Sequence, residues 1–227
     1  MTTAKLVVFD VAGTTVFDGD IVIDAMDEAL RLAGARVDRN AVRALMGVPK
    51  PVAIRTLLVR HQADAGDTVV DQVHHAFLER VLDRYRRAST VREMEGAGTV
   101  FAALHERGIK VALDTGFSRP ILDVLLHRLG WAAPGVIDCS VTSDEVAHGR
   151  PAPDLIWRAM QLTGVADART VVKVGDTPAD IESGRAAACG CVVGVAYGTH
   201  SRSELERCRP SAIIDRLSDL IALVEAR

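Results

Sequence analysis

Short apolar runs alternate with amphipathic segments along most of the chain, and this alternation predicts an α/β fold. The runs that we expect to form strands are residues 5–10, 109–114, 136–141, 170–175, 191–195 and 212–215. Between the later runs lie segments whose apolar residues recur three and four positions apart, which is the spacing of one helix face. Strands that alternate with helices are typical of βαβ units, so we expect a doubly wound parallel sheet.

A different pattern separates the first predicted strand from the others. Between residues 20 and 88 apolar positions recur at helical spacing, as in Ala25, Met26 and Ala29, and strand-forming runs are sparse. We therefore expect a Rossmann-like core domain formed by residues 1–16 and 92–227, with a helical cap domain formed by residues 17–91. An insert beside the first loop of a sheet edge is well placed to act as a lid.

Polar residues follow the ends of three predicted strands. Asp10 ends the first, Asp114 and Thr115 end the next core strand, and Asp176 follows the strand that ends at Gly175. Right-handed crossovers bring the carboxyl ends of parallel strands to one edge of the sheet, where ligands bind. This edge is the predicted active site.

Two of these strand ends suit a phosphate group. In the segment Asp10-Val-Ala-Gly-Thr-Thr, Gly13 permits a tight turn, and the hydroxyl of Thr14 and nearby N–H groups suit an anion. Thr115 and Gly116 precede a predicted helix, whose free N–H groups also favour anions. Taken alone, each segment is also consistent with simple capping of a turn or helix.

Arg150 and the acid pair Asp176 and Asp180 are the remaining candidate site residues. Arg150 stands in the proline-containing loop Gly-Arg-Pro-Ala-Pro, where a fixed guanidinium suits phosphate and carboxylates. Asp176 and Asp180 lie four residues apart at a predicted helix start. Acids gathered around Asp10 indicate a hard cation with oxygen ligands, and Mg²⁺ fits because it shares its positions with water and phosphate.

The order of these four segments resembles the haloacid dehalogenase superfamily over nearly the whole chain. The resemblance implies that Asp10 is the nucleophile of a Mg²⁺-dependent phosphoryl-transfer hydrolase. It assigns the family's Thr/Ser and Lys/Arg positions to Thr115 and Arg150, and its acidic metal pair to Asp176 and Asp180. The helical insert resembles the C1-type cap of that superfamily.

One departure points to a particular branch of the superfamily. Its phosphatases carry a second Asp, which protonates the leaving group, two residues after the nucleophile, but here that position is Ala12. With Ala12, the segment Met-Gly-Val-Pro-Lys50 in the cap resembles phosphonoacetaldehyde hydrolase (phosphonatase). That family forms a Schiff base on the cap lysine, so the resemblance implies an imine on Lys50 and adds the Ala12 carbonyl to the metal ligands Asp10, Asp176 and Asp180.

The position of Lys50 fits an amine nucleophile. Pro51 suits the first helical position, so we expect Lys50 at or near the N-cap of a helix. The positive end of a helix disfavours the ammonium form, and partial burial acts in the same direction on the pKa of Lys50. The alternative for a lysine in such a loop is a solvated side chain.

A mismatch in the cap leaves the substrate open. The phosphonatase motif has a histidine three residues after its lysine, and here that position is Ala53. The leading hypothesis is cleavage of the C–P bond of phosphonoacetaldehyde or a close 2-oxoalkyl phosphonate. The alternatives are a Mg²⁺-dependent phosphomonoesterase acting on a small phosphorylated metabolite, and a non-catalytic protein that binds phosphometabolites.

Charge and composition bear on partners and location. The net charge is −3, with 25% charged residues, so no basic excess indicates nucleic acid or a membrane surface. No apolar run reaches the length of a transmembrane helix, and the N-terminus lacks a signal pattern, so we expect a cytoplasmic protein. Members of the family that the sequence resembles often dimerise through cap helices, which implies a possible homodimer.

Overall fold

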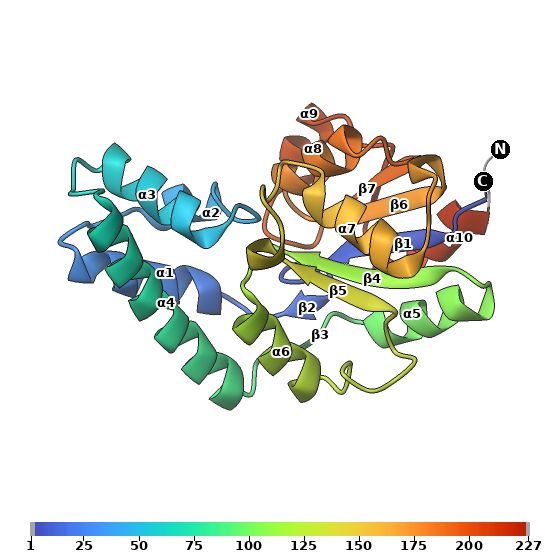
Figure 1. Ribbon diagram of the computed structural model, residues 1–227, viewed down its shortest axis with the longest axis horizontal. Helices are drawn as coiled ribbons and strands as arrows, with labels where there is room; N and C mark the ends of the chain where they lie inside the picture. The colour runs from blue at the N-terminus through green and yellow to red at the C-terminus, as the bar shows by residue number, and fades with distance from the viewer. Residues whose placement is uncertain (1–2, 226–227) are drawn as a thin grey trace.

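A six-stranded parallel sheet forms the centre of the computed structural model, which describes residues 3–225 (Figure 1). The strand order is β5-β4-β1-β6-β7-β8, so the chain winds outward from β1 in both directions. The expected doubly wound α/β fold is therefore confirmed. The strands are β1 (Leu6–Asp10), β4 (Lys110–Thr115), β5 (Cys139–Thr142), β6 (Val171–Gly175), β7 (Cys191–Val195) and β8 (Ala212–Ile214).

Helices cover both faces of the sheet because its central strands are apolar on both sides. Within β1, Val7 and Phe9 pack into one hydrophobic core, while Leu6 and Val8 pack into a second core on the other face. The first face carries α5 (Ala97–Glu106), α6 (Arg119–Arg128) and α10 (Leu220–Glu225). The other carries α7 (Asp154–Thr163), α8 (Pro178–Ala186) and α9 (Arg202–Arg207).

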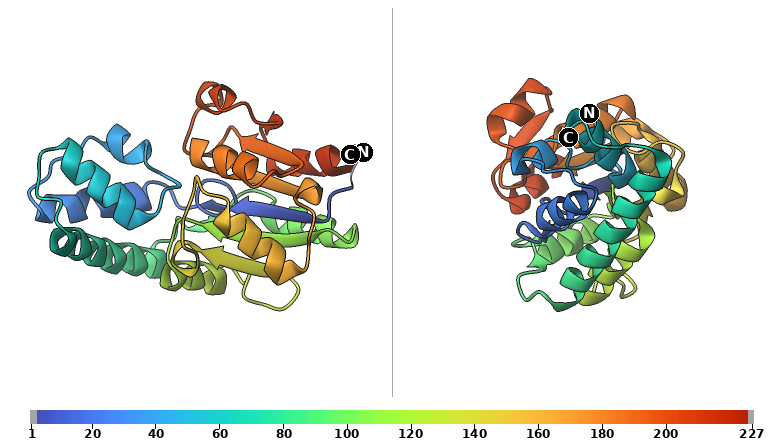
Figure 2. Two further views of the ribbon diagram at one scale, coloured as in Figure 1. Left: turned by 45° about the horizontal axis from the view of Figure 1, so that its top comes forward. Right: turned by 90° about the vertical axis from the view of Figure 1, so that its left-hand side faces the viewer.

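Four helices lie beside the carboxyl ends of the strands, as Figures 1 and 2 show. They pack against one another around apolar side chains such as Leu30, Leu57 and Phe77. We call this group of helices the cap. Its members are α1 (Ile21–Leu32), α2 (Arg39–Arg43), α3 (Lys50–Arg60) and α4 (Asp67–Arg87).

The two chain segments that join the cap to the sheet form a small antiparallel pair. Its strands are β2 (Val16–Phe17) and β3 (Arg92–Glu93), and the guanidinium of Arg92 stacks on the Phe17 ring at 3.9 Å from its centroid. The sequence did not predict this pair, because two residues are too few to show alternation. It fixes the entry and exit of the cap side by side.

Element boundaries differ from the predictions in a few places. Strand β5 begins at Cys139 instead of residue 136, because Ile137 bridges back to Pro134 in a turn and the Asp138 carboxylate accepts a hydrogen bond from the backbone of Val111. Helix α9 was not predicted. Three short 3₁₀ helices complete the list: η1 (Ser143–Glu145), η2 (Ala168–Thr170) and η3 (Leu217–Asp219).

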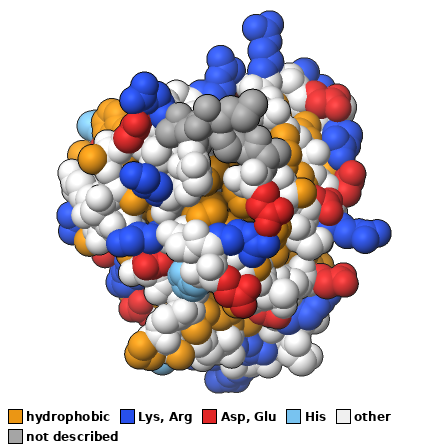
Figure 3. Space-filling view, turned by 90° about the vertical axis from the view of Figure 1, so that its right-hand side faces the viewer, with side chains coloured by type: hydrophobic (Ala, Val, Ile, Leu, Met, Phe, Trp, Pro, Cys, Tyr) orange, Lys and Arg blue, Asp and Glu red, His pale blue; other side chains and the backbone are white. Residues whose placement is uncertain are grey.

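The surface shows no strong segregation of charge on the face at the far end from the cap. Figure 3 shows basic and acidic side chains interspersed there, in keeping with the small net charge. Within residues 3–225, no helix combines the length and the apolar character needed to cross a bilayer.

Candidate active site

The carboxyl ends of β1, β4 and β6 lie side by side and gather the polar residues that follow them. Strand β1 pairs with β4 in a register that sets Asp10 beside Asp114, and it pairs with β6 on its other side. Asp176 directly follows β6, and Thr115 ends β4. The predicted strand-end residues therefore meet at one edge, beneath the cap.

Arg150 links the nucleophile candidate to the helix that follows β6. Its Nη2 atom donates to Oδ1 of Asp10 at 2.7 Å, and its Nη1 atom donates to Oδ1 of Asp180. The side chain is 1% exposed, so both contacts are shielded from water. Arg150 thus holds a cationic group directly beside Asp10, as the loop pattern predicted.

Lys173 is a buried residue whose role the sequence analysis missed. Its Nζ atom contacts Oδ1 of Asp114 and lies 3.1 Å from Oδ1 of Asp180, and its side chain is completely buried. The signal was present, because a lysine within the apolar strand Val171–Gly175 must find a partner when it is buried. Through these contacts Lys173 links β6 to β4 and to helix α8 below the site.

Asp176 lies close against the turn that follows β1. Its Oδ1 atom accepts a hydrogen bond from the Thr14 hydroxyl at 3.2 Å, and its Oδ2 atom accepts one from the Thr199 N–H at 2.6 Å. Gly13 has a φ of +89°, and a Cβ at this position would collide with the Asp176 carboxylate. Gly13 therefore allows the turn to approach the acid.

These residues together leave an excess of buried negative charge suited to a cation. The four carboxylates are those of Asp10, Asp114, Asp176 and Asp180, and all four are at most 5% exposed. Arg150 and Lys173 neutralise only two of them. Ligand atoms of Asp10, Asp114 and Asp180 lie within 4.8 Å of one another, and Oδ2 of Asp114 has no hydrogen-bond partner among the described residues. Oxygen ligands with surplus negative charge fit a hard divalent ion such as Mg²⁺.

Asp180 and Asp10 have different surroundings, which shift their pKa values in opposite directions. The Asp180 carboxylate already contacts Arg150 and Lys173, and its Oδ2 accepts from the Thr177 hydroxyl at 2.6 Å. These cations hold the pKa of Asp180 below its usual value despite burial. Burial raises the pKa of Asp10 to about 8, and the Arg150 charge opposes that rise. Further positive charge would be needed to keep Asp10 ionised at neutral pH.

Lys50 reaches the same site from the cap. Pro49 is the N-cap of α3, so Lys50 occupies the first helical position and Pro51 the second; the helix begins one residue earlier than the sequence predicted. The side chain is 4% exposed, and its Nζ atom lies 5.5 Å from the centroid of the Phe117 ring. Burial, with the nearby Arg150 charge, lowers the pKa of Lys50 from 10.5 to about 8.

Glycines allow the cap loop, residues 46–50, to press against the core. A Cβ at Gly47, which has a φ of +83°, would lie 2.6 Å from the Thr177 hydroxyl oxygen. A Cβ at Gly116 would lie 3.0 Å from the Gly47 carbonyl oxygen and 3.2 Å from that of Val48. Because neither glycine has a Cβ, the loop that carries Lys50 can approach the strand ends this closely.

A small cavity of about 20 Å³, which we call the reaction cavity, lies between the cap loop and the core. Six of the predicted site residues line it, namely Asp10, Ala12, Lys50, Thr115, Gly116 and Arg150. Thr14 is fully buried and uses its hydroxyl on Asp176, and Gly13 lines a neighbouring cavity instead. Met46 and Phe117, for which the sequence assigned no role, also line the reaction cavity.

The fold and this site define the class of protein. Residues 4–188 match the family model described as haloacid dehalogenase-like hydrolase, so the chain belongs to that family, as the sequence predicted. The chain is 31% identical over 224 residues to "Probable phosphatase IndB" of Dickeya dadantii, a match that covers 97% of this chain and 94% of that protein.

Two further relatives bear on the branch and the fold. The chain is 29% identical over 235 residues to "Phosphonoacetaldehyde hydrolase" of Bacteroides fragilis, covering 98% of this chain and 88% of that protein. The crystal structure of a hydrolase from Pseudomonas syringae superposes with a TM-score of 0.87 at 20% identity, covering 99% of each chain. The chain is thus a haloacid dehalogenase-like hydrolase with relatives that are named for phosphorus chemistry.

Proposed function

We propose that this protein hydrolyses the C–P bond of phosphonoacetaldehyde or a close 2-oxoalkyl phosphonate, releasing phosphate and an aldehyde, or the corresponding ketone where the carbonyl carbon carries a further substituent. The observation that carries the proposal is the buried amine of Lys50, which lines one cavity with Asp10 and Arg150. Similarity to proteins named phosphonoacetaldehyde hydrolase supports it. An amine beside a carboxylate nucleophile is unnecessary for the hydrolysis of a phosphate ester.

Lys50 is suited to form an imine near neutral pH. With a pKa of about 8, about a tenth of the side chains carry the neutral amine at pH 7, which is roughly 300 times the fraction for an ordinary lysine. The neutral Nζ attacks the carbonyl carbon of the substrate, and the carbonyl oxygen leaves as water. The protonated imine that results draws electrons from the neighbouring C–P bond.

Asp10 then accepts the phosphoryl group. One carboxylate oxygen attacks phosphorus, the C–P bond breaks, and its electron pair forms an enamine attached to Lys50. Thr115 and Arg150 hold the phosphonate oxygens. Water cleaves the acyl phosphate to phosphate and Asp10, and protonation and hydrolysis of the enamine release the aldehyde. The leaving carbon needs no acid at Ala12, because the imine takes up the electrons.

We further propose that Mg²⁺ is held by Asp10, the Ala12 carbonyl and Asp176, with Asp180 behind them. The excess of buried negative charge supports a cation at this edge of the sheet. The carboxylates that lie within 4.8 Å of one another are those of Asp10, Asp114 and Asp180, so the place of Asp176 in the ligand set rests on the family resemblance. When bound, the ion neutralises charge on the phosphonate and on Asp10 as they approach. Arg150 supplies a permanent positive charge beside Asp10.

The test combines trapping with kinetics. Borohydride added with phosphonoacetaldehyde should reduce the imine, and peptide mass spectrometry should find the adduct on Lys50. Phosphate release should require Mg²⁺, and it should disappear in Lys50→Arg, which keeps a positive charge but cannot form the imine. Full phosphonate hydrolysis by Lys50→Arg would disprove the imine mechanism.

A second candidate is a phosphomonoesterase acting on a small phosphorylated metabolite. Ala53 favours it, because the phosphonatase motif places a histidine there, and so does the relative named probable phosphatase. This activity would release phosphate from sugar phosphates and would survive in Lys50→Arg. A parallel assay on both variants and both substrate classes separates the two functions.

A further inference from the structure

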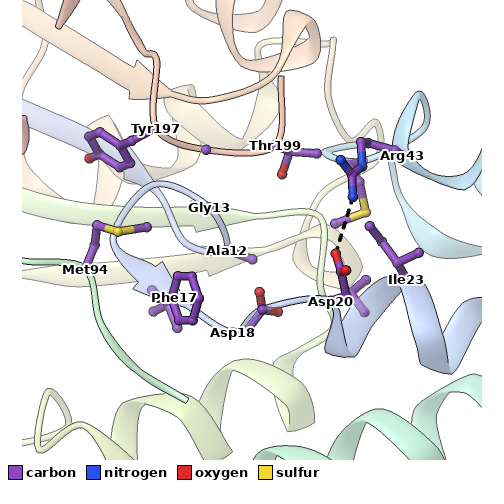
Figure 4. Close-up of a pocket in the computed structure, with 15 residues that line it drawn as sticks. Ala12, Gly13, Phe17, Asp18, Asp20, Ile23, Arg43, Met94, Tyr197 and Thr199 are labelled. Atoms are coloured by element: carbon purple, nitrogen blue, oxygen red, sulfur yellow. Dashed lines mark hydrogen bonds and ion pairs between the residues drawn. The ribbon is translucent and has the colours of Figure 1, made fainter. Parts of the chain in front are cut away.

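A second cavity of about 140 Å³ adjoins the reaction cavity beneath the cap (Figure 4). Ala12 and Met46 line both cavities, so the two lie next to each other at these residues. The second cavity extends away from Asp10 toward the segment that leads into helix α1. We call it the side cavity.

The walls of the side cavity are mostly apolar, with one buried acid. Phe17, Ile23 and Met94 contribute apolar surface. Asp18 also lines it, is 8% exposed, and has its carboxylate directed toward Ala12 in Figure 4. One oxygen of Asp18 accepts a hydrogen bond from the Tyr85 hydroxyl at 2.5 Å. A carboxylate in such a position has remaining capacity to accept a hydrogen bond from a ligand.

Other charged groups on the side cavity are already paired near solvent. The side chains of Asp20 and Arg43 are half exposed, and Nη2 of Arg43 lies 3.3 Å from Oδ1 of Asp20. Arg39 also pairs with Asp20. Burial raises the pKa of Asp18 to about 6, so this acid is ionised above that pH. Asp18 is therefore the charged group that a ligand would meet inside the cavity.

The sizes of the two cavities limit where a larger substrate can extend. The reaction cavity, at about 20 Å³, has room for about one water molecule. The side cavity at 140 Å³ has room for a small organic group. A substituent beyond the carbonyl carbon therefore has more room in the side cavity, next to Ala12 and Met46.

We propose that the side cavity is the specificity subsite, and that it selects 2-oxoalkyl phosphonates whose carbonyl carbon carries a substituent ending in a hydroxyl or amino group. This inference rests on the proposed function. Asp18 accepts a hydrogen bond from the terminal group, while the apolar walls contact the connecting carbon. A substituent ending in a carboxylate is repelled, because it would place two like charges together in a buried site.

Asp18 also has a structural explanation that the test must separate. It lies on the segment entering the cap, and Tyr85 lies near the end of α4, where the chain leaves the cap. Their hydrogen bond joins the two connections. A purely structural brace would affect all substrates alike, whereas recognition would affect only those that differ in the terminal group.

The experiment compares three phosphonates of equal carbon number. The probes are 2-oxopropylphosphonate, 3-hydroxy-2-oxopropylphosphonate and phosphonopyruvate, which end in methyl, hydroxyl and carboxylate. We expect kcat/KM to be about tenfold higher for the hydroxyl probe than for the methyl probe, as is typical for a hydrogen bond to a charged group. The carboxylate probe should be the poorest of the three.

Matched variants assign the preference to Asp18. Asp18→Ala should bring the hydroxyl and methyl probes within about threefold of each other, and Asp18→Asn should improve the carboxylate probe relative to the other two. Tyr85→Phe breaks the same hydrogen bond but keeps the carboxylate, so it should retain the preference, as should Asp71→Asn, an exposed control that lines neither cavity. An unchanged preference in Asp18→Ala, or its equal loss in Tyr85→Phe, overturns the inference.

A binding arm keeps this inference separate from the proposed function. Asp10→Asn protein is titrated calorimetrically with dihydroxyacetone phosphate and with hydroxyacetone phosphate, which differ only in the terminal hydroxyl. If the wild type cleaves no phosphonate but dihydroxyacetone phosphate binds more tightly in an Asp18-dependent way, the proposed function fails and the subsite stands. If phosphonates are cleaved without regard to the terminal group, the function stands and the subsite fails.

Discussion

Replacing Lys50 with methionine should abolish phosphonate hydrolysis and make the metal-free protein more stable. The amine sits in a buried position that lowers its pKa from 10.5 to about 8. Below pH 8 the Lys50 amine is protonated in the folded protein, and its burial makes this charged form unfavourable, which lowers the stability of the fold. The difference between the two pKa values corresponds to about 3 kcal/mol. Methionine fills a similar volume without this cost.

The sign of the pH dependence provides an internal check. Between pH 8 and 10.5 the unfolded chain binds a proton at Lys50 that the folded protein has lost, so the stability of the wild type rises with pH in this window. The variant has no such contribution. The advantage of Lys50→Met should thus be largest near pH 7 and should shrink by about 1 kcal/mol by pH 9.

Urea unfolding followed by circular dichroism, in the presence of EDTA, measures the free energy of unfolding at both pH values. Lys5→Met, which replaces an exposed lysine, serves as the matched control and should change stability by less than about 0.5 kcal/mol. The reasoning is refuted if Lys50→Met is less stable than the wild type at pH 7, or if its advantage does not shrink toward pH 9.

Three further predictions address the loop, the buried charges and the reaction. Gly116→Ala places a Cβ 3.0 Å from the Gly47 carbonyl oxygen of the cap loop. It should lower kcat/KM by about tenfold to a hundredfold while shifting Tm little. Unchanged kinetics would show that the loop moves aside without affecting the site. Lys173→Met leaves the buried carboxylates of Asp114 and Asp180 without this partner, and it should cost about 3–5 kcal/mol in urea unfolding, whereas a loss below about 1 kcal/mol would contradict the assigned pairing. The kcat/KM for phosphonoacetaldehyde should rise with pH to a plateau above about pH 8 as Lys50 loses its proton; a plateau already reached at pH 6 would argue against the neutral amine.

The sequence predicted the sheet well because its elements are long enough to show a period. Five-residue runs such as Leu6–Asp10 and Cys191–Val195 are buried throughout and almost entirely apolar, as is typical of central parallel strands. Strands β2 and β3 span two residues each, so their pairing depends on where the cap brings the chain back. No local pattern encodes that return.

The site was predictable where strand ends determine position, and less so where packing does. Asp10 and Thr115 follow from topology, since parallel strands deliver their carboxyl ends to one edge. The pairing of Lys173 in β6 with Asp114 in β4 depends on side chains meeting across the intervening strand β1, which a single sequence does not specify. The role of Asp18 depends on the position of Tyr85, which is 67 residues away in sequence.

Ala12 and Lys50 form one electrostatic arrangement. Ala12 lines both cavities, close to Asp10 and within a region that already holds more acids than bases. An aspartate at this position would add a further negative charge near the Lys50 amine, and a nearby opposite charge favours the protonated form of a lysine. It would also raise the cost of ionising Asp10, because like charges at close range oppose each other. In the proposed mechanism alanine therefore favours both reacting groups together: the amine loses its proton more readily, and the carboxylate stays ionised more readily. Alanine at this position thus suits a cavity that an amine and a carboxylate share.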